Sequence, residues 1–155
     1  MSDKIANRLH ELGIKLPSAA APAANYIPYK ISEKTLYISG QLPLVGGKLP
    51  TTGIVGDTVS PEQAYDLARQ CGINLISVMH LALEGDLDRV RAILKLGGFV
   101  ASTPGFVGQP AVINGCSDLM VEVFGEAGRH ARSAVASPSL PLGTPVEIDA
   151  IVAID

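Results

Sequence analysis

The alternation of apolar and polar residues is clearest at the end of the chain. Apolar side chains occupy every second position from Val146 to Ile154, while Glu147 and Asp149 begin the opposite face, which turns apolar at Ile151. Side chains of a β-strand point alternately to its two faces, so the pattern predicts a strand. Because its second face is only partly polar, we expect both faces to be covered.

Two longer segments have the three- and four-residue periodicity of amphipathic helices. The first covers residues 64–82 and follows Ser60, Pro61 and Gln63, which provide an N-cap, a proline for the first helical position and a capping box. The second is expected from about Gln109 to Phe124. Both helices should pack their apolar stripes on a sheet.

Shorter patterns complete the expected order of elements. Ile5, Leu9 and Leu12 predict a short docking helix ending near Gly13, within an N-terminal helical extension over residues 1–17. A proline- and alanine-rich connector, residues 17–28, follows it.

Three further segments are expected to be extended. Residues 36–38 predict a strand that stops at Ser39-Gly40, residues 90–102 a long strand interrupted at Gly97-Gly98, and residues 132–136 another extended segment. The glycine pair at 97–98 indicates either a bulge or close packing against a neighbouring chain. The fold class is therefore α+β, a mixed β-sheet with two main helices on one face.

Composition restricts the broad class of protein. The 155 residues fit a single domain, placed at 18–155, and 12 basic against 15 acidic residues give a net charge of −3. Without a basic run, nucleic acid is disfavoured as a partner. No apolar stretch is long enough for a membrane span, and the first residues lack the apolar core of a signal peptide, so we expect a cytoplasmic protein with no membrane partner.

The metal-binding residue types are scattered. Cys71 and Cys116 are isolated within helical patterns and are interpreted as buried small hydrophobes, and the histidines are His10, His80 and His130. None has the spacing of a metal site, so no metal is expected. His130 is near Arg132 and could act as a base, but a loop or interface histidine is the commoner explanation.

Arg132 is the strongest candidate for chemistry. Arg132, Ala134 and Ala136 share one face of an extended segment, and small neighbours leave the guanidinium uncrowded for a carboxylate. With Glu147 there are two interpretations. Either Arg132 is an anion clamp and Glu147 the acid/base group beside it, or the two residues are simply surface charges, as a cross-strand ion pair or unrelated to each other. Burial and Asp149 would raise the pKa of Glu147 and Arg132 would lower it, so the direction stays open.

Four segments, in their order and spacing, carry a resemblance to a known family. They are Asn25-Tyr26, residues 37–43 (YISGQLP), residues 112–114 (VIN), and residues 131–135 (ARSAV) with Leu140-Pro141 and residues 146–148 (VEI). From about Pro22 to Asp155 the chain resembles the reactive-intermediate deaminases, the Rid or YjgF-type proteins. The resemblance implies a chorismate-mutase-like fold and a homotrimer whose sheets form an inner barrel, with sites between subunits.

The resemblance also implies roles for individual residues. Arg132 would bind a substrate carboxylate and Glu147 would position or activate water. The other implied residues are the pocket-lining Tyr26, Ser39, Gly40 and Ala134, and the architectural Asn114 and Pro141. The chain is similar to a divergent branch, because Ala134 replaces a family cysteine, residues 25–29 (NYIPY) replace the usual Gly-Pro-Tyr, and an extra N-terminal stretch runs through Pro17.

The function implied by the resemblance is hydrolysis of reactive enamines or imines derived from amino acids. The products are a 2-oxo acid and ammonia, and no metal or organic cofactor is needed. An alternative is non-catalytic binding or sensing of small carboxylate metabolites, which Ala134 and the altered segment around Tyr26 favour. A third function, ribonuclease or translation inhibitor, is disfavoured by the acidic charge balance.

Overall fold

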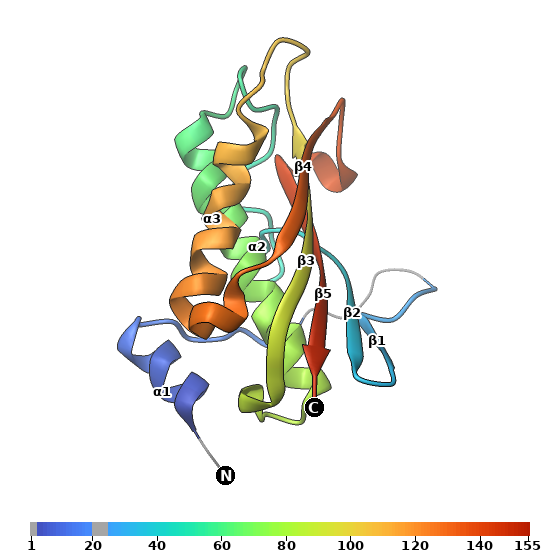
Figure 1. Ribbon diagram of the computed structural model, residues 1–155. Coiled ribbons are helices and arrows are strands. Elements are labelled where there is room, and N and C mark those ends of the chain that lie inside the picture. Colours follow the sequence, from blue (N-terminus) through green and yellow to red (C-terminus); the bar gives the residue numbers. More distant parts are fainter. Residues whose placement is uncertain (1–2, 20–24) are drawn as a thin grey trace.

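The computed structural model describes residues 3–19 and 25–155. One mixed β-sheet carries two long helices on one face, and a short helix lies at the side of this layer (Figure 1). The elements, in chain order, are α1 (Lys4–Glu11), β1 (Tyr29–Ser32), β2 (Thr35–Gln41), α2 (Pro61–Ala82), β3 (Val90–Ala101), α3 (Gln109–Phe124), β4 (Ala131–Ser137) and β5 (Val146–Ile154). The predicted α+β architecture is confirmed.

The sheet has the strand order β1-β2-β5-β3-β4. β3 and β4 run parallel, which requires a crossover connection, and α3 supplies it. The other neighbouring strands are antiparallel. The edge strand β1 was not expected from the sequence, because its alternation of apolar and polar residues covers only four positions directly after the proline-rich connector.

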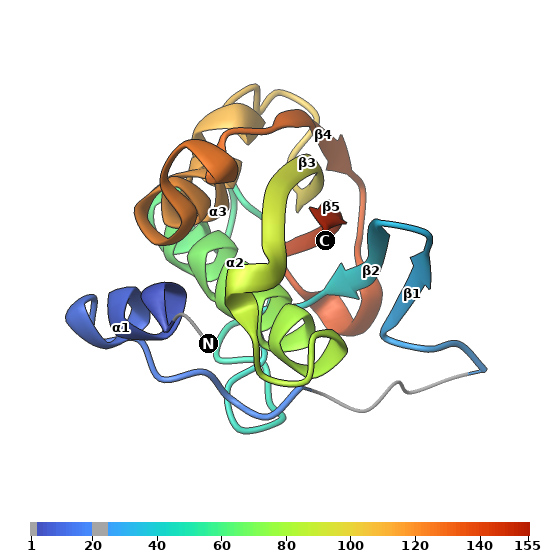
Figure 2. The same cartoon turned by 60° about the horizontal axis from the view of Figure 1, so that its bottom comes forward.

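The two long helices begin and end where the sequence predicts. The Ser60 backbone N–H donates to the side chain of Gln63 at 2.9 Å, and the Gln63 N–H donates to Ser60 Oγ at 3.1 Å, completing the capping box of α2. Figure 2 shows α2 and α3 side by side on the same face of the sheet. The hydrophobic core lies between these helices and the sheet, and it includes Cys71 and Cys116, both fully buried as expected.

The sheet face that points away from the helices is here named the open face. Every second residue of β5, from Val146 to Ile154, is buried against the helices, whereas Glu147 and Asp149 are part-exposed on the open face. No helix within residues 3–19 and 25–155 covers this face (Figure 2). Within the described residues, the helices bury one side of the sheet and leave the second side part-exposed.

The glycine pair in β3 does not interrupt the strand, contrary to the prediction. A Cβ on Gly97 would lie 2.5 Å from Asp149 Oδ1, and a Cβ on Gly98 would lie 2.7 Å from Ile113 Cγ1 of α3. The glycines thus allow close packing within the same chain. β2 was also expected to stop at Ser39-Gly40, but it continues to Gln41 through a register irregularity.

The N-terminal helix docks on the turn before β3. Ile5 and Leu9 are buried, and the Asp88 carboxylate accepts the backbone N–H groups of Lys4 at 3.0 Å and Ile5 at 2.9 Å. Gly13 follows the helix with a φ of +67°, a value that favours glycine. The docking helix is confirmed, while the division of the chain at residue 17 stays a prediction.

Part of the expected connector cannot be compared with the structure. Residues 20–24, which include Pro22 at the start of the resemblance, lie outside the described residues. Across the described segments, no helix has the length and apolar character needed to cross a bilayer.

Candidate functional site

Arg132 lies on the edge strand β4 and points toward α3. It is paired with Leu96 of β3, which is fully buried under the helices, and paired residues of parallel strands share a face. The guanidinium Nη1 donates to Ser117 Oγ at 3.0 Å, and Nη2 donates to the carbonyl oxygen of Pro110 at 3.1 Å. Two of its five N–H donors therefore serve α3, and three take no part in these bonds.

Glu147 lies on the central strand β5, on the open face. It is paired with Phe99 of β3, whose side chain is 37% exposed. Its carboxylate packs against Gly40, so closely that a Cβ at position 40 would collide with Glu147 Oε1 and lie 3.1 Å from Glu147 Cδ. Gly40 thus approaches Glu147 with its backbone.

The sheet separates Arg132 from Glu147. The two residues face opposite sides, β3 lies between their strands, and their positions differ by three residues along β3 (Leu96 against Phe99). Two strand spacings and three residues correspond to about 10 Å in each direction. The cross-strand ion pair is therefore wrong, and among residues 3–19 and 25–155 no ion pair involves Arg132.

The electrostatics of the two carboxylates reflect this separation. Burial, and then the charge of Asp149, raise the pKa of Glu147. Burial likewise raises the pKa of Asp149, against the lowering effects of the Gly97 backbone N–H and of Lys95. The charge of Arg132 does not contribute to the pKa shift of Glu147, because the sheet lies between the two side chains.

The remaining predicted residues fall into two groups. Ser39 precedes Gly40 on β2, and its Oγ donates to the carbonyl of Ile27 at 2.8 Å, which ties down the segment that carries Tyr26. Tyr26 is 51% exposed. Near Arg132 the structure places Ala134 on the same face of β4. Asn114 of α3 and Arg132 both line a pocket of about 270 Å³. Pro141 is exposed in the 3₁₀ turn before β5.

Ser117 and His130 were missed as partners of Arg132. Ser117 Oγ lies 2.9 Å from His130 Nε2, and His130 Nδ1 lies 2.6 Å from the carbonyl oxygen of Gly128. Ser117 carries no signal of its own, since a lone serine in a helical pattern has no distinctive spacing. His130 was noted only for its nearness to Arg132 in the chain.

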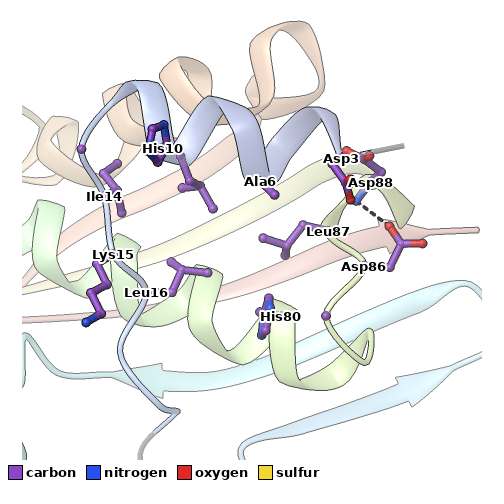
Figure 3. A pocket seen from close by; sticks show the side chains of 13 residues that line it. Asp3, Ala6, His10, Ile14, Lys15, Leu16, His80, Asp86, Leu87 and Asp88 are labelled. Carbon is purple, nitrogen blue, oxygen red and sulfur yellow. Dashed lines mark hydrogen bonds between the residues drawn. The ribbon is translucent and has the colours of Figure 1, made fainter. Parts of the chain in front are cut away.

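A separate pocket of about 550 Å³ lies between α1 and the end of α2. Figure 3 shows that its walls combine apolar side chains such as Ile14, Leu16 and Leu87 with His10 and His80. None of the predicted site residues lines it. Within the described part of the chain, no three histidine, cysteine, aspartate or glutamate side chains are grouped so that they could hold a metal ion.

Comparison with known proteins places this geometry in a family. Residues 6–151 match the family model described as "YjgF/chorismate_mutase-like, putative endoribonuclease". Protein TCP17 of Trypanosoma cruzi is 49% identical over 154 residues, which cover 97% of this chain and 94% of that protein. The crystal structure of Atu1372 from Agrobacterium tumefaciens, a protein of unknown function, is 52% identical with a TM-score of 0.92, covering 99% of this chain and 94% of that one.

A more distant structure shares the fold. E. coli TdcF, solved with bound serine, is 21% identical with a TM-score of 0.65, covering 88% of this chain and 94% of that one. These findings agree on one family: the family model matches nearly the whole chain, two relatives are close in sequence, and the sheet and helices are shared. The chain belongs to the YjgF/chorismate-mutase-like family, the Rid-type proteins.

Proposed function

We propose that the protein hydrolyses reactive enamines or imines derived from amino acids and releases a 2-oxo acid and ammonia. The observation that carries the proposal is Arg132, a part-buried guanidinium anchored on α3 with three N–H donors outside those anchors and no ion pair among the described residues. A planar fork of this kind suits a carboxylate, which every amino-acid-derived imine carries. Membership of the Rid-type family supports the same chemistry.

The reaction needs two groups besides the substrate. Arg132 binds the substrate carboxylate and so fixes the imine carbon. Glu147 orients a water and takes one of its protons as the water oxygen bonds to that carbon, and it passes this proton to the nitrogen. The hydroxyl proton of the resulting carbinolamine then follows to the nitrogen by the same carboxylate, the C=O bond forms as the C–N bond breaks, and ammonia leaves. The raised pKa of Glu147 suits this exchange, because a carboxyl that titrates closer to neutrality both accepts and returns a proton.

Because the two groups face opposite sides of the sheet, the site requires two subunits. In this proposal Arg132 of one subunit and Glu147 of its neighbour meet across the interface of a homotrimer. Support comes from the open face, on which exposed apolar side chains surround the two carboxylates; these include Tyr37, Phe99 and Val135. Burying such a face between subunits would form the central barrel expected for the family.

Two other functions are outcomes of the same test. Binding of a small carboxylate without hydrolysis would make the protein a sensor, and the serine in the structure of TdcF is a small ligand that carries a carboxylate. The family description also names an endoribonuclease. A net charge of −3 gives little attraction for a phosphate backbone and argues against that activity.

The test combines an activity assay with a binding assay. Ammonia release is measured from imines generated in situ by an amino acid oxidase, and 2-oxobutanoate is titrated into the wild type and two variants. Arg132→Lys should weaken binding about 10- to 100-fold, because an ammonium cannot replace a bidentate charged hydrogen bond. Arg129→Lys is the control, since Arg129 borders the same pocket but pairs with Glu126 at 3.0 Å.

Each outcome separates the candidate functions. Ammonia release above the uncatalysed rate, lost in Arg132→Lys and kept in Arg129→Lys, supports the proposal. Binding without ammonia release supports a sensor. Equal affinities of the wild type and Arg132→Lys would return Arg132 to a structural role.

A further inference from the structure

A chain of hydrogen bonds leads from the backbone of one turn to the guanidinium of Arg132. The carbonyl oxygen of Gly128 can only accept, so the proton that it receives at 2.6 Å belongs to His130 Nδ1. In the neutral ring, Nε2 is then an acceptor, and it lies 2.9 Å from Ser117 Oγ. The Ser117 hydroxyl therefore donates to His130, which turns its lone pairs toward the N–H of Arg132 at 3.0 Å.

The start of this chain is held by backbone packing. Gly128 is buried against the last turns of α3, where a Cβ would collide with the carbonyl oxygen of Met120 and lie 2.9 Å from the backbone nitrogen of Val121. The turn can thus approach α3 only because residue 128 is a glycine. Its carbonyl, and through it the imidazole of His130, is placed by the helix itself.

The end of the chain decides how the guanidinium is oriented. Arg132 has two anchors on α3, the hydroxyl of Ser117 and the carbonyl of Pro110, one on each Nη. Two anchors fix the plane of a rigid fork, whereas one leaves it free to rotate. When His130 accepts the Ser117 proton, that proton points away from Arg132 and the lone pairs of the hydroxyl remain for the guanidinium.

The neighbouring charges have partners of their own. Asp118 accepts from the hydroxyl of Tyr65 at 2.7 Å, and Arg129 pairs with Glu126 at 3.0 Å. Both border the same pocket as Arg132, Ser117 and His130. Arg132 is therefore anchored by neutral groups, and among the described residues no carboxylate pairs with its charge, so the guanidinium can pair with an anionic ligand.

We propose that Ser117 and His130 are positioning residues, which fix the plane of the Arg132 guanidinium for carboxylate binding. They do so through a relay of hydrogen bonds in which the carbonyl of Gly128 sets the tautomer of His130, His130 sets the direction of the Ser117 hydroxyl, and Ser117 holds Arg132. The inference rests on the proposed function, because it names the groups that prepare the clamp. It assigns neither residue a contact with substrate. It predicts instead that both act through one hydroxyl group.

The binding test uses 2-oxobutanoate as the probe. Ser117→Ala should weaken its binding about 3- to 10-fold, the effect of one lost hydrogen bond, and Ser117→Thr should restore most of it. The control is Ser77→Ala, another serine within a long helix, whose hydroxyl bonds the carbonyl of its own helix at 3.1 Å. The double variant Ser117→Ala/His130→Gln should bind no worse than Ser117→Ala, since the two residues act through the same bond.

A second measurement needs no ligand. The ¹⁵N chemical shifts of His130 should report the Nδ1–H tautomer, and rotation of the Arg132 guanidinium, followed by NMR, should be slower in the wild type than in Ser117→Ala. A Nε2–H tautomer, or equal rotation rates in the two proteins, would overturn the relay. So would unchanged binding in Ser117→Ala when the wild type binds.

The failure of the proposed function is distinguishable from the failure of the relay. A wild type that binds no 2-oxo acid removes the proposed ligand, and the tautomer and rotation measurements still decide whether Ser117 and His130 order Arg132. A folded Ser117→Ala protein, checked by its melting temperature, is required for either comparison.

Discussion

At the residue scale, the position of the Glu147 carboxylate depends on the glycine that it packs against, Gly40. Any side chain at position 40 would occupy the space of its carboxylate, so the backbone of β2 reaches Glu147 only because Gly40 has none. The same contact contributes to the burial that raises the pKa of Glu147. The position of one carboxylate and its proton affinity therefore have a common cause.

Gly40→Ala should displace the Glu147 carboxylate and reduce turnover by about 10²-fold or more, as expected for a misplaced acid/base group. Imine hydrolysis and the melting temperature are measured together. The control is Gly105→Ala, because a Cβ at Gly105 has no atom within 4 Å. Full activity in a folded Gly40→Ala protein would contradict the assigned role of Glu147.

The raised pKa of Glu147 has a consequence for stability. The folded state binds this proton more tightly than the unfolded state, so between the ordinary pKa of 4.5 and the raised value the free energy of unfolding falls as pH rises. Glu147→Gln removes the titrating carboxyl, and with it this fall in the free energy of unfolding. Urea unfolding from about pH 4 to about pH 7 should show the variant gaining stability relative to the wild type as pH rises. A difference that stays constant with pH would mean that the pKa is not shifted.

At the scale of elements, the contact between α2 and α3 depends on glycines. A Cβ on Gly115 of α3 would collide with the carbonyl oxygen of Tyr65 and lie 3.1 Å from the backbone nitrogen of Arg69, so the two helix backbones approach closely there. At Gly72 of α2 the nearest atoms would instead be side-chain atoms, Leu119 Cδ2 at 2.8 Å and Cys116 Sγ at 3.1 Å.

Gly115→Ala should therefore destabilise the protein by about 1–3 kcal/mol, because helix backbones cannot move aside as a side chain can. Gly72→Ala is the comparison, and it should cost less, since a methyl group of Leu119 can rotate away. Denaturant unfolding of both variants measures the difference. An equal cost at the two positions would show that the backbone contact has no special weight.

At the scale of the whole molecule, the open face of the sheet is the surface on which the proposed assembly depends. Its apolar side chains are exposed in one chain, and Val135 on the edge strand is 46% exposed. A face of this character is typical of an interface between subunits. The proposed site also needs a second chain, because Arg132 and Glu147 lie on opposite sides of the sheet.

Light scattering should give a mass about three times the chain mass of 16.1 kDa. Val135→Asp should lower this mass and the activity together, because it places a charge in the proposed interface. Val107→Asp is the matched control at an 85% exposed valine in the loop before α3. A monomeric wild type at micromolar concentration would contradict the two-subunit site.

The sequence by itself determined the local elements and the candidate residues. The capping residues and periodicity of residues 60–82, and the alternation of residues 146–154, are local patterns, and the structure confirms both. The identities of Arg132 and Glu147 were readable because their neighbours set them apart and because the family pattern places both. Their roles stay predictions.

Only the tertiary structure decided which residues meet. Strand pairing put Arg132 and Glu147 on opposite faces, since a shift of one residue in register would reverse a face and no local pattern specifies that register. It also brought Ser117 to Arg132, fifteen residues away in the chain, and Gly40 to Glu147. These contacts depend on how α3 and β2 pack on the sheet, which is a property of the folded chain as a whole.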